Sequence, residues 1–191
     1  MNTLFAHSSR FILLALFALM AATRSHHFAS VTHLPDASWA VFLLAGFYSG
    51  RAWLFVALLA LAGLSDYLAI GWFGVSDYCI SAAYGFLVPA YGSLWLAGRW
   101  YSRRHRLQAS TLLPLSAALL AGTALCEAIS GGSFYFLAGR AAETSLAGYA
   151  AQFLTYYPAS LQGTALYVAV AALVHAVFAL AATGGSRAAA R

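Results

Sequence analysis

The chain has 191 residues, of which 62% are hydrophobic and 8% are charged, and its mean hydropathy is +0.77. A water-soluble domain of this size could not cover so much apolar surface with so few polar side chains. The composition therefore predicts a polytopic membrane protein. The net charge of +5 comes from ten arginines and no lysine against five acids. In such a protein a basic excess marks cytoplasmic loops, so no nucleic-acid partner is expected.

Sequence motifs exclude several functions. The two cysteines, Cys79 and Cys126, are far apart and form no CxxC, so neither a zinc site nor a dithiol redox centre is indicated. Walker, HExxH and GxSxG motifs are absent from the sequence. No ATP-binding motif is therefore present, and any energy for transport would have to come from outside the chain.

Six apolar segments are candidates for membrane-crossing helices, since about 20 residues span a bilayer and fewer suffice where protein shields the ends. They cover residues 11–23, 39–48, 53–73, 77–98, 110–129 and 161–182. The first segment also resembles a signal-peptide core, because Arg10 precedes it and small residues follow. Residues 145–157 are expected to form a short surface helix closed by Pro158. Because a bilayer requires each backbone group to be satisfied within its segment, we predict an all-α bundle forming one transmembrane domain, 1–191.

Arginine placement predicts the orientation of this bundle. Residues 99–106 carry four arginines and should form a cytoplasmic loop. With six spans, Arg10, Arg51, Arg187 and Arg191 fall on the same side, so both termini are predicted to be cytoplasmic. The opposite side then receives the loops 24–38, 74–76 and 130–160.

Polar side chains of chemical interest gather on that predicted outer side. They are His26, His27, His33, Asp66, Asp77, Tyr78, Cys79, Cys126, Glu127, Tyr135, Arg140, Tyr156 and Tyr157. Asp66 lies within a span, where an ionisable group is costly and is a functional candidate. It could instead bond a neighbouring tyrosine or Arg140 and fix helix packing. Asp77 is expected to be a helix-start acid beside the positive end of the helix dipole.

Cys79 is expected in the first turn of the fourth span, where the helix dipole favours the thiolate, the form that binds soft metals. Small residues would share the helix face beneath it, at Ala82, Ala83, Phe86 and Ala90. Such a face accepts either a neighbouring helix or a broad flat ligand. Alternatively, Cys79 is a small buried apolar residue or pairs with Cys126 in a disulfide.

The histidines do not complete a metal-ion site. His26 and His27 are adjacent and would point about 100° apart on a helix, so one of them could line a pocket. His175 is expected to be a packing residue of the last span. A lone thiolate instead suits a metal that a macrocycle already holds and that needs one axial ligand.

These features resemble the BtuM family along essentially the whole chain. The features that carry the resemblance are the small size with six expected helices, an AxxxA on the first helix (Ala18 and Ala22), and the segment SDYCISAAYG with Cys79 at the outer start of the fourth helix. BtuM proteins are multi-pass proteins of the bacterial inner membrane that take up cobalamin (vitamin B12). They are related to the substrate-binding S components of energy-coupling factor (ECF) transporters.

The resemblance implies that cobalamin enters the outer basin and that Cys79 is an axial ligand of its cobalt. His27, Asp66 and Tyr84 match positions associated with the family's binding site. In S components the small-residue face, here Ala18 and Ala22, packs against the scaffold of a module that carries two ATPases. Such proteins are thought to reorient in the membrane to present substrate inward.

Cobalt chemistry permits a further hypothesis, in which the Cys79 thiolate displaces the upper ligand of cyanocobalamin and promotes loss of cyanide, with or without reduction of the metal.

Two other classes of protein stay open. A membrane thiol redox enzyme would use Cys79 and Cys126. A structural membrane subunit would tolerate alanine at Cys79, Asp66 and His27 without loss of any ligand.

Overall fold

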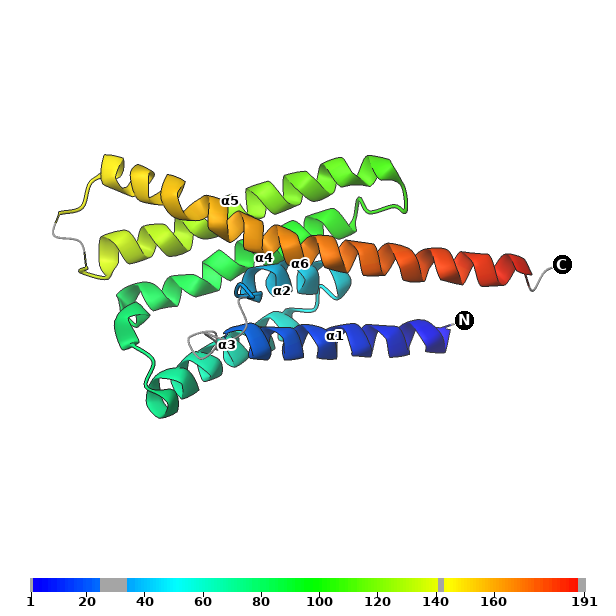
Figure 1. The fold of residues 1–191 in the computed structure, drawn as a ribbon, viewed down its shortest axis with the longest axis horizontal. Coiled ribbons are helices and arrows are strands. Elements are labelled where there is room, and N and C mark those ends of the chain that lie inside the picture. The colour runs from blue at the N-terminus through cyan, green and yellow to red at the C-terminus, as the bar shows by residue number, and fades with distance from the viewer. Residues whose placement is uncertain (1, 25–33, 141–142, 189–191) are drawn as a thin grey trace.

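The structure of the protein, a computed structural model, describes residues 2–24, 34–140 and 143–188. Its α-helices form an elongated bundle (Figure 1). They are α1 (Asn2–Arg24), α2 (Ser38–Tyr48), α3 (Ala52–Phe73), α4 (Leu87–Ser102), α5 (Leu112–Leu137) and α6 (Leu146–Ala188). No strand occurs in the described ranges, so the predicted all-α class is confirmed. Three helical stretches there are long and apolar enough to cross a membrane, namely Ala52–Phe73, Ala109–Leu137 and Leu146–Ala181.

The shortest α-helix, α2, lies at the centre of the bundle. It has 11 residues, and those from Ala40 to Gly46 are all buried. It contacts each of the other α-helices. Gly46 and Gly98 allow the backbones of α2 and α4 to touch, because an added Cβ at Gly46 would meet the Trp95 carbonyl and one at Gly98 the Leu43 carbonyl. The predicted segment 39–48 is therefore a helix whose neighbours cover it, which explains why it can be short.

The predicted start of the fourth helix at Asp77 is wrong. Residues 77–86 form two short 3-10 helices, η2 (Asp77–Cys79) and η3 (Ala82–Phe86), and the α-helix begins at Leu87. Two serines cause the break, because Ser76 Oγ accepts the N–H of Tyr78 and Ser81 Oγ accepts the N–H of Ala83. Such side-chain bonds compete with helical bonds and favour turns.

A proline is also consistent with the start of α4 at Leu87. Pro89 falls in the first turn of α4, where its missing N–H breaks no helical bond. Gly74, with φ of 70°, ends α3 before this segment in the left-handed conformation that favours glycine. The segment between Gly74 and Leu87 is therefore a compact connection that leads into α4.

The predicted short surface helix 145–157 and the separate span 161–182 are also wrong, because they are parts of one helix. Helix α6 runs from Leu146 to Ala188 and continues through Pro158. Membrane helices tolerate an internal proline, because neighbouring groups can satisfy the freed backbone carbonyls. Helix α5 extends to Leu137, so the predicted outer loop 130–160 shrinks to the residues between Leu137 and Leu146.

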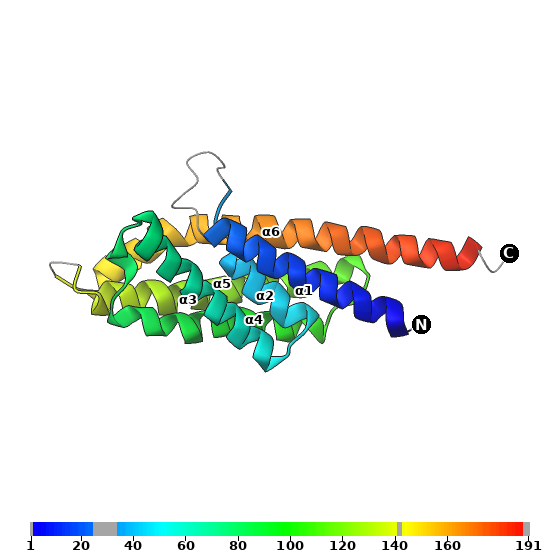
Figure 2. The ribbon, with the colours of Figure 1, turned by 90° about the horizontal axis from the view of Figure 1, so that it is seen from below.

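The two chain ends lie toward the same end of the bundle (Figure 1). Figures 1 and 2 both place the N- and C-terminal ends and the α4–α5 connection toward one end, and η2, η3 and the α5–α6 connection toward the other. The first end holds the arginines of residues 99–106. We refer to it as the arginine end and to the other as the Cys79 end.

Candidate functional site

Arg24, the last residue of α1, is the centre of a hydrogen-bond cluster that joins α1 to α4. Its Nε and Nη2 donate to Oδ1 and Oδ2 of Asp66 on α3 at 2.8 and 2.7 Å. Its Nη1 donates to Ser38 Oγ on α2 at 3.0 Å and to the Tyr91 hydroxyl on α4 at 2.9 Å. The side chains of Arg24 and Asp66 are 8% and 24% exposed, so this bidentate pair is largely removed from solvent.

Tyr84 connects this cluster to the segment that carries Cys79. The Tyr84 hydroxyl on η3 donates to Asp66 Oδ2 at 2.7 Å. The structure thus brings the predicted site residues Asp66 and Tyr84 together, and the expectation that a tyrosine bonds Asp66 is confirmed. The alternative partner, Arg140, is wrong, because its guanidinium lies 4.8 Å from the Tyr78 ring centroid and donates to the Tyr78 carbonyl.

Cys79 presents an exposed, free thiol at the end of η2. Because η2 has three residues and is not an α-helix, the argument that a helix dipole favours the thiolate does not apply here, nor does it apply to Asp77. The expected small-residue face also changes: Ala83 and Ala90 are buried, whereas Ala82 is exposed.

The second cysteine has a different environment. Cys126 is free and fully buried in the core of the bundle. The alternative of a disulfide between Cys79 and Cys126 is therefore wrong for this structure. The thiol redox reading loses support as well, because a buried thiol lacks the access that thiol exchange requires.

A cavity of about 420 Å³ begins beside Tyr78, the residue before Cys79. It is lined by Tyr78, Glu127, Ser130, Gly131, Phe134, Gln152 and Tyr156. Glu127 is 8% exposed and accepts a hydrogen bond from Ser160 Oγ at 3.2 Å. Three members of the predicted outer group, Tyr78, Glu127 and Tyr156, therefore line one polar and aromatic cavity at the Cys79 end.

The other predicted residues lie apart from this cavity or outside the described chain. Ala18 and Ala22 are exposed on α1, four residues apart and thus on one helix face. His27, like its neighbours His26 and His33, lies outside the described residues.

Sequence reasoning missed Arg24, Ser38 and Tyr91 as members of the cluster. The positive-inside pattern treats arginines as markers of orientation and does not reveal that Arg24 pairs with Asp66. A usable signal was present, because Arg24 ends the first apolar run on the side where Asp66 also falls, and a charge there needs a partner.

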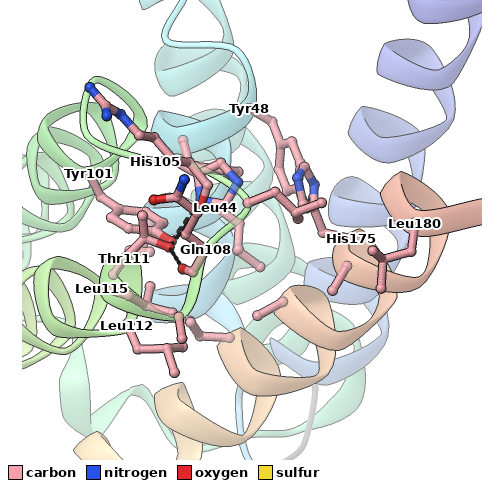
Figure 3. A pocket seen from close by; sticks show the side chains of 18 residues that line it. Leu44, Tyr48, Tyr101, His105, Gln108, Thr111, Leu112, Leu115, His175 and Leu180 are labelled. Carbon is pink, nitrogen blue, oxygen red and sulfur yellow. Dashed lines mark hydrogen bonds between the residues drawn. The ribbon is translucent and has the colours of Figure 1, made fainter. Parts of the chain in front are cut away.

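The arginine end has a second cavity, of about 340 Å³, between α2, α6 and the α4–α5 connection (Figure 3). The rings of His105 and His175 meet edge to face, with 5.1 Å between their centroids. The Tyr101 hydroxyl lies 2.9 Å from Nδ1 of His105, and the Tyr48 hydroxyl lies 3.4 Å from Nδ1 of His175. Burial, together with the neighbouring His175, lowers the pKa of His105 below its usual value. His105 is therefore mainly neutral at pH 7. His175, expected to be a packing residue, also lines this cavity.

Fold and composition define the class of protein: in the described ranges it is an all-α protein with three helices long and apolar enough to cross a membrane. No family model matches the chain, and no curated protein matches it. In the described part of the chain, no group of three or more His, Cys, Asp or Glu side chains could hold a metal ion.

Proposed function

We propose that the chain is a multi-pass protein of the bacterial inner membrane that binds cobalamin at the Cys79 end, as an S component resembling the BtuM family. The observation that carries the proposal is the exposed thiol of Cys79 on a segment that Tyr84 fastens to the Asp66–Arg24 pair. Among the described residues, Cys79 offers an accessible sulfur and no three protein ligands cluster for a metal ion, an arrangement that suits cobalt that a corrin ring already holds.

The proposed orientation places the arginine end in the cytoplasm, with six crossings and both termini on that side. Arg24 would then lie at the outer side, where Asp66 neutralises its charge. Helix α2 measures about 17 Å at 1.5 Å per residue, less than the roughly 30 Å hydrocarbon core. Its burial among the other helices supports counting it as a crossing, since protein and not lipid surrounds it.

In the proposed site, Cys79 is the axial ligand of cobalt, and Asp66 and Tyr84 hold its segment in place. His27 is proposed as a further contact, on the strength of the resemblance alone. The cavity lined by Tyr78, Glu127 and Gln152 supplies hydroxyl, carboxylate and amide groups that suit the amide side chains around a corrin ring.

The proposed partner is an ECF module of a membrane scaffold protein and two ATPases, which would supply the energy that this chain has no motif to provide. Ala18 and Ala22 support this part of the proposal, because they leave a small, exposed surface on α1. Small residues allow the backbones of two membrane helices to approach closely.

The spectrum of bound corrinoid tests the site. Purified protein incubated with cyanocobalamin should retain it and show shifted visible bands, because sulfur replaces an axial ligand of cobalt. Cys79→Ala should abolish the shift and weaken retention by about tenfold or more, the equivalent of roughly 1.4 kcal/mol of lost binding energy. Cys126→Ala is the matched control, since that thiol is buried in the core, and it should keep the shift. Folded protein that retains no corrinoid would contradict the proposal.

Loss of cyanide tests the catalytic part of the proposal, in which Cys79 acts as the catalytic residue. The Cys79 sulfur bonds to Co(III), the cobalt–carbon bond breaks, and cyanide leaves with the thiol proton as HCN, so no electron donor is required. We expect cyanide release from the parent protein and a loss of at least about tenfold in rate for Cys79→Ser, because a hydroxyl is a far weaker ligand for a soft metal. Equal rates for the two proteins would rule out this step but leave binding intact.

A further inference from the structure

The cavity at the arginine end has an apolar body and a polar rim. Leu44, Leu112, Leu115, Val168, Ala172, Ala176 and Leu180 provide the apolar part, and Tyr48, Tyr101, His105, Arg106, Gln108 and His175 the polar part. Figure 3 shows His175 and Leu180 of α6 across the space from Tyr101, Gln108 and Leu112. The cavity is therefore shaped for a molecule with one polar and one apolar end.

Beyond Val168, one face of α6 lines the cavity and another face is exposed. Val168 is 3% exposed, whereas Leu173, Val177 and Phe178 are 68%, 64% and 73% exposed. In both ribbon views the C-terminal end of α6 continues past the other helices (Figures 1 and 2). In a protein that crosses a membrane, lipid would surround the exposed face of α6, so an acyl chain can reach the cavity from the side.

Charge at the rim selects the polar end of the ligand. Residues 99–106 carry Arg99, Arg103, Arg104 and Arg106, and no acid lies among them. Arg106 is exposed beside the cavity that it lines. Basic pockets between membrane helices on the cytoplasmic side favour anionic lipid head groups.

The two imidazoles add hydrogen-bond donors. When the hydroxyl of Tyr101 donates to Nδ1 of His105, the proton of the neutral ring lies on Nε2 and can be donated to a phosphate oxygen. Tyr48 and His175 have the same relation at 3.4 Å. The rim thus offers donors as well as positive charge.

We propose that this cavity is a binding site for one anionic phospholipid, with its phosphate at Arg106, His105 and His175 and an acyl chain between α5 and α6. The site lies at the opposite end of the bundle from Cys79 and does not depend on the proposed cobalamin function. The bound lipid fills the cavity and fastens α6 to the α4–α5 connection.

Native mass spectrometry of the detergent-purified full chain tests the proposal. The protein should retain added phosphatidylglycerol about fivefold more strongly than phosphatidylcholine, the preference expected from one nearby basic residue. Arg106→Gln should remove this preference. Ala176→Trp should fill the cavity and lower phosphatidylglycerol retention by about fivefold or more. The matched control is Ala169→Trp, on the same helix at an exposed position that does not line the cavity, and it should retain the lipid as the parent does.

Several outcomes would overturn the proposal. Equal retention of the two lipids, or unchanged retention in Ala176→Trp, would show that no specific lipid site exists there. Inorganic phosphate or glycerol 3-phosphate that bound as tightly as the lipid would instead indicate a site for the free anion. Ala172→Phe is a second variant that fills the cavity, and it keeps the test open if Ala176→Trp does not fold.

Discussion

Replacing Arg24 with methionine is expected to lower the free energy of unfolding by about 3 kcal/mol, the lower end of the cost of breaking a buried ion pair. The lower end applies because the Asp66 side chain keeps 24% exposure. The substitution leaves the Asp66 carboxylate without its cation and removes two further hydrogen bonds, to Ser38 and Tyr91. Denaturant unfolding in detergent micelles, followed by circular dichroism, measures the change.

A matched control and a double mutant separate the ion pair from general effects of losing an arginine. Arg140→Met removes an arginine whose contacts, with the ring and carbonyl of Tyr78, are solvent-exposed, and it should cost less than about 1 kcal/mol. Arg24→Met combined with Asp66→Asn should cost less than the sum of the two single variants by about 1 kcal/mol or more. If Arg24→Met unfolds like Arg140→Met, the cluster does not stabilise the bundle.

The Arg24 cluster also joins the segment that carries Cys79 to α1, the helix with the proposed partner surface. Asp66 bonds both Arg24 at the end of α1 and Tyr84 on the segment that follows Cys79. The exposed alanines proposed to contact the ECF scaffold, Ala18 and Ala22, lie on the same helix as Arg24. Direct hydrogen bonds therefore join the segment that carries Cys79 to the end of α1, the helix that bears the proposed partner surface.

Helix positions were predictable where apolar composition alone decides them. The segments 39–48 and 53–73 match α2 and α3 to within one residue at each end. The fourth segment failed at its start, because hydropathy does not register the Ser76 and Ser81 turns that break the chain into η2 and η3. Pro89 marked the true start in the sequence, as a proline in the first helical turn.

The same reasoning about proline failed at Pro158, which lies inside α6. Whether a proline ends a helix depends on whether neighbouring groups satisfy the backbone carbonyls that it frees, and sequence spacing alone does not reveal that.

The candidate site was predicted only in part, because the sequence does not show which side chains bond each other. The resemblance names both Asp66 and Tyr84 as ligand contacts. The sequence does not show that these two side chains bond each other, or that Arg24 donates to both carboxylate oxygens of Asp66.

Replacing Gly98 with alanine is expected to destabilise the bundle strongly, although it adds only one methyl group. In Gly98→Ala the new Cβ meets the backbone carbonyl of Leu43 on α2, which is buried and cannot rotate away as a flexible side chain could. Overpacking of a core costs about 1 to 3 kcal/mol of unfolding free energy. The cost at Gly98 should lie at or above the upper end of this range, because the new Cβ belongs to one helix and clashes with the backbone of another. Unfolding in detergent and the folded fraction in size-exclusion chromatography measure the loss.

Gly92 provides the matched control, because it lies on the same helix and its nearest neighbour, Cζ of Phe55, would be 3.9 Å from an added Cβ. Gly92→Ala should leave the protein at least as stable as the parent, since alanine is favoured over glycine in a helix interior by roughly 0.5 to 1 kcal/mol. The contrast matters for the site, because α4 carries both Gly98 and Tyr91, and the Tyr91 hydroxyl accepts a hydrogen bond from Arg24. Gly98→Ala should therefore also weaken binding at the Cys79 end in whatever fraction stays folded. If Gly98→Ala and Gly92→Ala were equally stable, the backbones of α2 and α4 could not touch as described.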